Sequence, residues 1–349
     1  MQCLVPALIL KILSTKSMHW YNGRANNLTV QEILNGNRRV LARFLTQVEN
    51  NPDAVRNELA ELFPHSANSH IIGITGAPGT GKSSLVTMLA KQFRQQDETV
   101  AIVAVDPTSP FSGGAILGDR IRMRDLSGDK GVYIRSMASR GNLGGLAWMT
   151  QDVVRVLAAA RYQRVIVETV GAGQSEVDVV RMAHTTIVVE APGLGDDVQA
   201  IKAGILEAAD IIVVNKSDLT GAEKAERALK SMLELGHPTK YHASEAFFWN
   251  PPIVRTSSKT GEGFDILKQK IDEHYQVIRQ HENYHTFLIE QITIEFNKRL
   301  QATLFKRLVD TLEDEVIAGI IKRITQYDID PQQAVDELLR EVTFSRSET

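Results

Sequence analysis

Apolar side chains recur at helical spacing along the first part of the chain, up to Pro64. The residues that set this spacing are Val30, Ile33, Leu34, Val40, Leu41, Phe44, Leu45 and Val48. Apolar residues three and four positions apart fall on one face of an α-helix. The spacing therefore predicts an N-terminal helical region over residues 28–68.

Beyond Pro64 the pattern changes to short runs rich in β-branched residues. These runs are "IIGIT" at 71, "VAIVAVD" at 100, "RVIVETV" at 164, "TTIVVEA" at 185, "IIVVNKS" at 211 and "PIVRTSS" at 252. Helical patterns separate most of them, at 82–95, 144–161, 197–208, 221–234 and 264–279. Strands that alternate with helices and are apolar on both faces predict an α/β fold, with a mostly parallel sheet covered by helices on both faces. This domain is expected over residues 69–279, with its ligands at the carboxyl ends of the strands.

The two ends of the chain show other patterns. Strand signals fade after residue 280, and amphipathic helical spacing predicts a helical C-terminal arm over residues 280–349. Residues 1–27 are interpreted as an N-terminal extension without regular structure. Lys11 interrupts its apolar run, which is too short to span a bilayer. A targeting segment and an upstream start ahead of Met18 stay open as alternatives.

A glycine-rich stretch, "GITGAPGTGKSSL" at 73–85, lies between a predicted strand and a predicted helix. Gly76, Gly81, Lys82 and Ser83 fit the P-loop pattern, and this strand and helix context gives the pattern its meaning. Backbone N–H groups and the helix N-terminus can bind phosphate oxygens, the lysine can reach the β and γ phosphates, and the serine hydroxyl can bind Mg²⁺. The predicted nucleotide-binding residues here are Gly76, Ala77, Pro78, Gly79, Thr80, Gly81, Lys82, Ser83 and Ser84.

The segment "VVNKSD" predicts which base the nucleotide carries. Asn215, Lys216 and Asp218 end a later apolar strand, and a carboxylate there can accept hydrogen bonds from both guanine N1–H and the guanine N2 amine. Adenine offers no such pair of donors, so the pattern predicts GTP or GDP as the ligand. Ser257, Ser258 and Lys259 follow the last strand, where a further loop is expected to meet the guanine edge. A plain turn remains the alternative for that loop.

Acidic residues at strand ends indicate how GTP would be hydrolysed. Glu168 begins an acid-x-x-Gly pattern in which the acid orients Mg²⁺ or its water and the N–H of Gly171 contacts the γ phosphate. Asp106 closes the strand at 100, and Asp119 lies in a Gly- and Pro-rich loop of the kind that closes over a nucleotide. We therefore predict Lys82, Asp119, Glu168 and Gly171 as catalytic residues, and Ser83, Asp106, Asp119 and Glu168 as residues around the metal.

Position 172 is alanine, where Ras-like GTPases carry the glutamine that orients water. We therefore expect slow hydrolysis by the chain alone, with Gln174 or a partner completing the site.

Composition limits the partners and the compartment. The chain has 39 basic and 42 acidic side chains and a net charge of −3, so no overall positive field would hold nucleic acid or a membrane surface. One arginine cluster could contact nucleic acid; its members are Arg120, Arg122, Arg124, Arg135 and Arg140. Acidic residues lie among these arginines and no aromatic platform accompanies them, which argues against a nucleic-acid site. Cys3 is the single cysteine, which favours a reducing compartment: the cytoplasm, or the mitochondrial matrix if the source is eukaryotic.

One short pattern would suggest a different activity. "HENYH", from His281 to His285, matches the zinc-protease arrangement of two histidines and a glutamate on one helix face. It lies beyond the predicted nucleotide domain and has no evident third ligand, so we interpret it as a solvated helix face.

Five longer segments resemble one known family. They are "GAPGTGKSSL", "DPTSPFSGGAILGDRIRM", "ASRGNLGGLA", "ETVGAGQSE" and "APGLGDDVQAIKAGILEAADIIVVNKSD". They are similar to those of the MeaB/ArgK-type GTPases, chaperones of adenosylcobalamin-dependent acyl-CoA mutases in the SIMIBI class of P-loop GTPases. The resemblance extends from about residue 28 to about residue 275.

The resemblance implies a homodimer with a C-terminal dimerisation arm, whose nucleotide state gates transfer of adenosylcobalamin into methylmalonyl-CoA mutase and protects that enzyme. It implies Mg²⁺ and GTP or GDP as ligands, with no cobalamin held permanently by this chain. It also implies that residues 193–204 form a switch that contacts the mutase. Two features depart from the family pattern: the apolar start before Met18, and Ser258 in place of an alanine.

Two other activities remain as alternatives. Members of the family have been labelled arginine or ornithine transport kinases, but a guanine-reading loop argues against an ATP-dependent kinase. A nickel-insertion GTPase would call for clustered cysteine or histidine ligands, which this sequence does not supply.

Overall fold

The computed structural model describes residues 26–107, 123–139, 145–169, 175–193, 206–235, 249–280 and 284–341. Within these residues, seven strands form one sheet in the order β3-β2-β4-β1-β5-β6-β7. Every neighbouring pair is parallel. The strands are β1 (His70–Thr75), β2 (Val100–Pro107), β3 (Val132–Ser139), β4 (Arg164–Thr169), β5 (Thr185–Glu190), β6 (Ile211–Val214) and β7 (Ile253–Arg255). The α/β fold class is therefore confirmed.

Six of these strands coincide with the predicted apolar runs, and β3 is an addition. Its residues "VYIRSMAS" form one edge of the sheet beside β2, and Ile134, Arg135 and Ser136 are only partly buried. β3 is an edge strand, with a neighbouring strand on one side only, and it is therefore covered less completely than a central strand. Polar side chains are tolerated there, so its sequence does not form a continuous apolar run.

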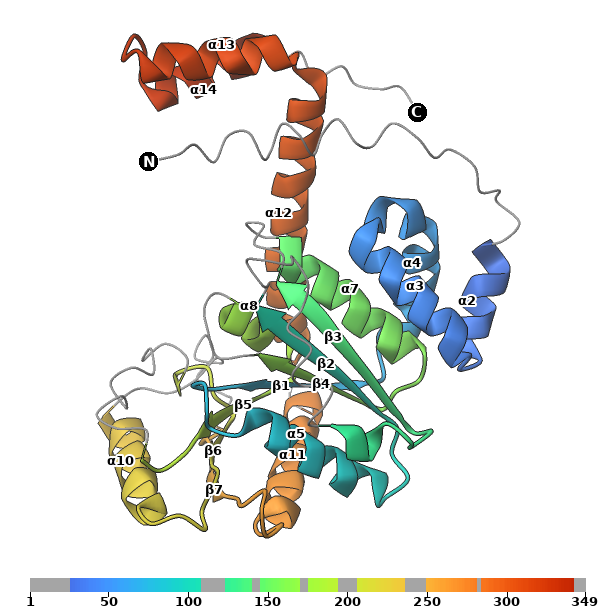
Figure 1. Ribbon diagram of the computed structural model, residues 1–349, viewed down its shortest axis with the longest axis vertical. Helices are drawn as coiled ribbons and strands as arrows, with labels where there is room; N and C mark the ends of the chain where they lie inside the picture. Colours follow the sequence, from blue (N-terminus) through green and yellow to red (C-terminus); the bar gives the residue numbers. More distant parts are fainter. Residues whose placement is uncertain are drawn as a thin grey trace.

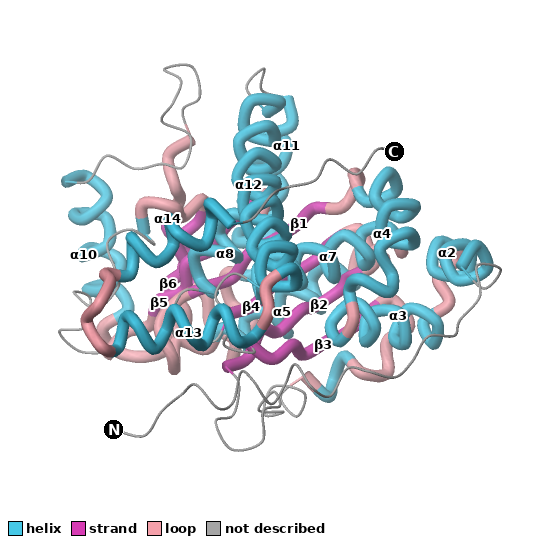
Figure 2. Tube along the Cα trace, turned by 90° about the horizontal axis from the view of Figure 1, so that it is seen from above, coloured by secondary structure: helices cyan, strands magenta, loops and turns pink. Residues whose placement is uncertain are grey.

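The helices cover both faces of the sheet, as Figures 1 and 2 show. Ile72, Ile74, Ile102 and Ile166 pack in one cluster with α5 (Lys82–Arg94) and α11 (Phe264–Gln280). The alternate residues of the same strands, such as Val103, Val105, Val165 and Val167, pack with α7 (Gly145–Ala159) and α8 (Ser175–Met182). A third cluster joins β6 to α10 (Ala222–Leu235). Side chains alternate across a strand, so apolar runs of this kind need cover on both faces.

The N-terminal helices extend the layer that contains α7. They are α2 (Asn26–Leu34), α3 (Arg38–Asn50) and α4 (Arg56–Leu62), and their buried side chains belong to the same cluster as those of α7. Asn37 caps α3, accepting hydrogen bonds from the backbone N–H groups of Arg39 and Val40. Arg135 of β3 forms an ion pair with Glu49 of α3, so this member of the arginine cluster has a structural partner.

The C-terminal arm is helical, as predicted, with α12 (Tyr284–Thr311), α13 (Asp314–Thr325) and α14 (Pro331–Glu341). Figure 1 shows α12 rising away from the sheet with α13 and α14 at its far end. Two ion pairs join α12 to α7: Arg299 to Asp152 at 2.6 Å, and Glu295 to Arg155 at 2.5 Å. Large apolar side chains lie exposed along α12, namely Ile289, Ile292, Ile294, Phe296, Leu300, Leu304 and Phe305.

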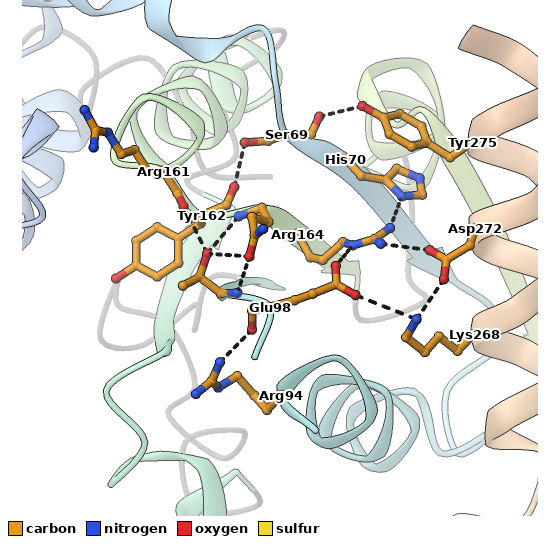
Figure 3. Close-up of polar contacts among 12 residues, drawn as sticks. Ser69, His70, Arg94, Glu98, Arg161, Tyr162, Arg164, Lys268, Asp272 and Tyr275 are labelled. Carbon is orange, nitrogen blue, oxygen red and sulfur yellow. Dashed lines mark hydrogen bonds and ion pairs between the residues drawn. The ribbon is translucent and has the colours of Figure 1, made fainter. Parts of the chain in front are cut away.

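A network of polar side chains lies at the amino end of the sheet (Figure 3). Arg164, the first residue of β4, forms ion pairs with Glu98 and with Asp272 of α11, the latter at 2.8 Å. Lys268 of α11 lies 2.8 Å from Asp272 and 3.7 Å from Glu98. The guanidinium of Arg164 also donates to Nδ1 of His70, at 2.8 Å. This network joins β1, β4 and α11 at the amino ends of the strands, whereas the P-loop lies at their carboxyl ends.

The histidine of this network is held neutral. Burial, followed by the nearby charges of His184, Arg164 and His274, keeps the pKa of His70 well below its usual range. With Nδ1 accepting from Arg164, its Nε2–H donates to the Thr185 hydroxyl at 2.8 Å. That hydroxyl then donates to Nδ1 of His274, at 2.9 Å. The amino end of β5 is thereby connected to α11 by a directed chain of hydrogen bonds.

In the described part of the chain, no helix is both long enough and apolar enough to cross a membrane.

Candidate functional site

The P-loop connects the carboxyl end of β1 to the first turn of α5. Gly76 has a φ of 142°, and a Cβ placed on it would lie 2.1 Å from the carbonyl oxygen of Val189 in β5. Gly81 precedes α5 with a φ of 90°, and a Cβ there would lie 2.5 Å from Nδ2 of Asn215. Because only glycine avoids both the contact and the backbone strain, the loop depends on these two residues for its shape.

Lys82 and Ser83 occupy the first turn of α5, and both are buried. Nζ of Lys82 donates to the carbonyl oxygens of Gly76 and Ala77, at 2.8 and 3.0 Å. The ammonium group thus lies against the inside of the loop, from which it can turn toward a phosphate. Of the other predicted loop residues, Pro78 and Gly79 are exposed and Thr80 is buried, while Ser84, on α5, is exposed.

The Ser83 hydroxyl donates to Oε1 of Glu168 at 2.6 Å, although the two residues are 85 positions apart. Glu168 is brought there by β4, which pairs with β1 and places Glu168 beside Ile74. Hydroxyl and carboxylate oxygens are the ligand types that Mg²⁺ prefers, so this pair fits a magnesium site. On its other side, β4 pairs with β2, where Ala104 is the partner of Glu168. Asp106 is two residues further along β2, so its backbone lies at the same carboxyl end of the sheet.

Asn215 joins the guanine-reading segment to the P-loop. Its Nδ2 donates to the carbonyl oxygen of Thr80 at 2.9 Å, and its Oδ1 accepts from Thr256 and Ser258, both at 3.2 Å. Asn215 is 1% exposed, so these contacts are made inside the protein. This residue therefore connects the P-loop with the loop after β7, a role that the four-residue pattern alone did not predict.

The neighbours of Asn215 complete this side of the site. Nζ of Lys216 donates to the carbonyl oxygen of Gly79 at 2.7 Å. The Ser257 hydroxyl donates to Oδ1 of Asp218 at 2.7 Å, and this hydrogen bond is the main cause that lowers the pKa of Asp218. An ionised Asp218 is an acceptor for two donors, which is the property that guanine recognition needs. Lys259 lies exposed in the same loop as Ser257 and Ser258.

Several predicted residues lie outside the described part of the chain. They are Asp119, Gly171, Gln174, residues 194–204 of the predicted switch, and Arg120, Arg122 and Arg140. The zinc-protease pattern also falls there from His281 to residue 283, while its last histidine, His285, is exposed on α12.

Glu190 is a site residue that the sequence analysis missed. It ends β5, directly before Ala191-Pro-Gly, and is 7% exposed. Burial raises the pKa of Glu190 to about 7, against an opposing effect of the Lys82 charge. No motif includes it, and the one available signal was an acid that closes an apolar strand beside the P-loop.

Comparisons with known proteins agree with this geometry. The family model "Methylmalonyl Co-A mutase-associated GTPase MeaB" matches residues 41–313. A relative in Pyrococcus abyssi, a GTPase by its name, is 42% identical over 313 residues, covering 90% of this chain and 95% of that protein. The GTPase ArgK of Escherichia coli is 36% identical, covering 68% of this chain and 72% of its own length.

A mouse relative and a crystal structure complete the comparison. The relative, "Methylmalonic aciduria type A homolog, mitochondrial" from Mus musculus, is 30% identical and covers 90% of this chain and 75% of its own length. The crystal structure of a LAO/AO transport system kinase has a TM-score of 0.69 at 24% identity, covering 92% of this chain and 99% of that one. That structure supports the fold alone.

Proposed function

The chain belongs to the MeaB family of methylmalonyl-CoA mutase-associated P-loop GTPases, and on that basis we propose that it is a GTP-hydrolysing chaperone of an adenosylcobalamin-dependent acyl-CoA mutase. In this role its nucleotide state gates delivery of adenosylcobalamin to the mutase and protects the loaded enzyme. Methylmalonyl-CoA mutase is the proposed partner, with a related acyl-CoA mutase as the alternative.

The observation that carries the proposal is the family match over residues 41–313, which includes both the P-loop and the guanine-reading segment. The family description names association with methylmalonyl-CoA mutase, and the mouse relative is named for methylmalonic aciduria. The contacts of Asn215 with Thr80 and Ser258 support a single nucleotide site built from both segments.

We assign the site residues as follows. The P-loop residues 76–84 and Lys82 bind the phosphates, while Asn215, Lys216, Asp218 and residues 257–259 bind guanine. Ser83, Asp106, Asp119 and Glu168 surround Mg²⁺, and Gly171 contacts the γ phosphate. The bound Mg²⁺ would neutralise charge that develops on the phosphates during hydrolysis.

The rate of hydrolysis is proposed to depend on the partner. Ala172 occupies the position of the water-orienting glutamine in Ras-like GTPases, so the isolated chain lacks that group there. A residue of the mutase, or Gln174, would complete the site. Slow hydrolysis by the chain alone would then keep GTP bound until the partner docks.

The C-terminal arm, residues 280–349, is proposed to form a homodimer interface. The exposed apolar side chains of α12, Ile292 and Phe296 among them, support this, because contiguous exposed apolar surface marks interaction sites. Cobalamin is proposed to pass to the mutase without permanent binding by this chain. The proposed compartment is the cytoplasm, or the mitochondrial matrix in a eukaryote.

The test is GTP hydrolysis by the purified protein, alone and with a stoichiometric adenosylcobalamin-dependent methylmalonyl-CoA mutase. We expect a slow rate that the mutase increases and that Lys82→Ala abolishes in both conditions. The exposed substitution Glu61→Gln on α4 serves as the matched control and should leave both rates unchanged.

Two further arms separate the alternatives. With ATP in place of GTP, hydrolysis should be negligible, and added arginine should receive no phosphate. An unchanged GTPase rate with the mutase, together with phosphorylated arginine, would refute the chaperone function and favour a small-molecule kinase.

A further inference from the structure

Glu190 is a buried acid beside the P-loop that the proposed hydrolysis does not use. It ends β5, the strand that pairs with β1 on the side opposite to β4. The preceding residue, Val189, packs directly under Gly76, whose Cβ position lies 2.1 Å from the Val189 carbonyl oxygen. The backbone carbonyl of Glu190 accepts from the backbone N–H of Asn215 at 2.8 Å. Glu190 is therefore held between the phosphate-binding loop and the guanine-reading segment.

The carboxyl group of Glu190 has little compensation for its burial. Its Oε1 is buried and has no hydrogen-bond partner among the described residues. A buried carboxylate without a partner is costly, and such a group reduces the cost by taking a proton.

The charged surroundings of Glu190 are simple in the described part of the chain. Lys82, at the start of α5, is the charged group whose field acts on it. The neighbouring strand β1 ends in Thr75, and Asn215 directly follows the other neighbour, β6; neither residue is ionisable. Beyond them, Lys216 is directed to the carbonyl oxygen of Gly79, and Glu168 bonds Ser83 on the far side of β1. The balance of burial and the Lys82 charge sets the pKa of Glu190 at about 7.

We propose that Glu190 takes up one proton from solvent when a nucleotide occupies the P-loop, and that this uptake makes nucleotide affinity depend on pH. The inference rests on the proposed function, because it requires a nucleotide at this loop. Phosphates would draw the Lys82 ammonium away from the Gly76 and Ala77 carbonyls and add negative charge near Glu190. Both changes disfavour the carboxylate and favour its neutral, protonated form. No covalent bond changes other than the O–H bond formed on Glu190.

The size of the effect follows from simple electrostatics. One additional unit of negative charge at about 6 Å, in a medium of effective dielectric constant near 20, raises a carboxyl pKa by roughly two units. A change from about 7 to about 9 would give an uptake of about 0.8 protons per nucleotide at pH 8. The same change would weaken nucleotide binding about 25-fold between pH 7 and pH 9.

The experiment is isothermal titration calorimetry of the full chain with GDP and Mg²⁺ at pH 8, in two buffers of different ionisation enthalpy. The difference between the two measured enthalpies gives the number of protons taken up. At this pH the terminal phosphate of the nucleotide is already ionised, since its last proton leaves near pH 6. The titrations are repeated at pH 7 and pH 9 for the change in affinity.

Two variants isolate the residue. In Glu190→Gln, whose amide imitates the neutral acid, we expect no uptake attributable to this position and an affinity that changes less than about threefold between pH 7 and pH 9. The exposed Glu61→Gln control should behave as the wild type.

The outcomes are distinguishable. GDP binding by the wild type without proton uptake overturns this inference and leaves the proposed function intact. Uptake that persists in Glu190→Gln assigns the proton to another group and also overturns it. Absence of GDP binding at every pH overturns the proposed function, and this inference with it. Should Glu190→Gln fail to fold, Glu190→Ala takes its place in the same titrations, and a wild type without proton uptake still overturns the inference.

Discussion

The network at the amino end of the sheet makes Arg164→Met a demanding test of how the fold is held together (Figure 3). Arg164 contacts Glu98, Asp272 and His70, and its side chain is only 14% exposed. Methionine keeps an apolar side chain of similar length but removes the charge, and with it the guanidinium that lies 4.8 Å from the centre of the Phe93 ring. Glu98 and Asp272 would then share the single ammonium of Lys268.

The expected loss in the free energy of unfolding depends on which ion pairs remain after the substitution. Breaking a buried ion pair by removing one partner costs about 3–5 kcal/mol, because a buried charge is left uncompensated. Lys268 still lies 2.8 Å from Asp272 and 3.7 Å from Glu98, so we place the cost of Arg164→Met at the lower limit, about 3 kcal/mol. In Lys268→Met, Arg164 keeps its contacts with both carboxylates, and we expect a cost of about 1 kcal/mol.

The assay is urea unfolding at pH 7, followed by circular dichroism, for the wild type and both variants. Arg56→Met is the matched control, because it removes an exposed ion pair with Asp53, and its effect should stay within about 0.5 kcal/mol. Affinity for GDP should be unchanged in Arg164→Met, since the network lies at the amino end of the sheet and the P-loop lies at its carboxyl end. A cost below 1 kcal/mol, or a larger cost for Lys268→Met, would refute the view that Arg164 is the centre of the network.

Three further predictions concern the nucleotide site and pH. Gly76→Ala places a Cβ 2.1 Å from the Val189 carbonyl oxygen and should weaken GDP binding at least about tenfold by calorimetry, whereas Gly128→Ala, with nothing within 4 Å, should have no effect. Asp218→Asn removes the acceptor for two guanine donors; GDP should bind about 100-fold more weakly and xanthosine diphosphate more tightly, and an unchanged base preference would contradict the assignment. Because the pKa of His70 is depressed in the folded protein, the unfolded chain binds that proton first as the pH falls; stability to urea should therefore decrease below about pH 6.5, and a flat profile down to pH 5 would count against this.

The sequence predicted each strand that is apolar on both faces, but it did not predict the edge strand, which has a neighbouring strand on one side only. β1, β2 and β4 to β7 were found from their runs of Ile and Val, whereas β3, with Arg135 and Ser136 at its centre, was not. The short helix α8 was not predicted either, because eight residues give too few turns for a clear helical period.

The candidate site could be predicted as far as its residues lie in motifs. The P-loop pattern named Lys82 and Ser83, and the acid-x-x-Gly pattern named Glu168, which the structure places 2.6 Å from the Ser83 hydroxyl. No motif pairs Asn215 with Thr80, or Val189 with Gly76, because such contacts depend on which strands become neighbours. The spacing of residues along the chain does not predict which strands become neighbours in the sheet.

The order of strands in the sheet has a consequence for synthesis of the chain on the ribosome. β1 occupies the middle of the sheet, yet its partners on either side, Arg164 in β4 and Thr185 in β5, are made long after His70 and Ile72. At about 5–20 residues per second, the apolar strand β1 leaves the ribosome on the order of 5–20 s before either neighbour exists. Throughout that interval its unpaired edges are open to wrong partners. We therefore expect nascent chains shorter than about 190 residues to depend on holding chaperones, and release of the chain at that length to yield aggregates.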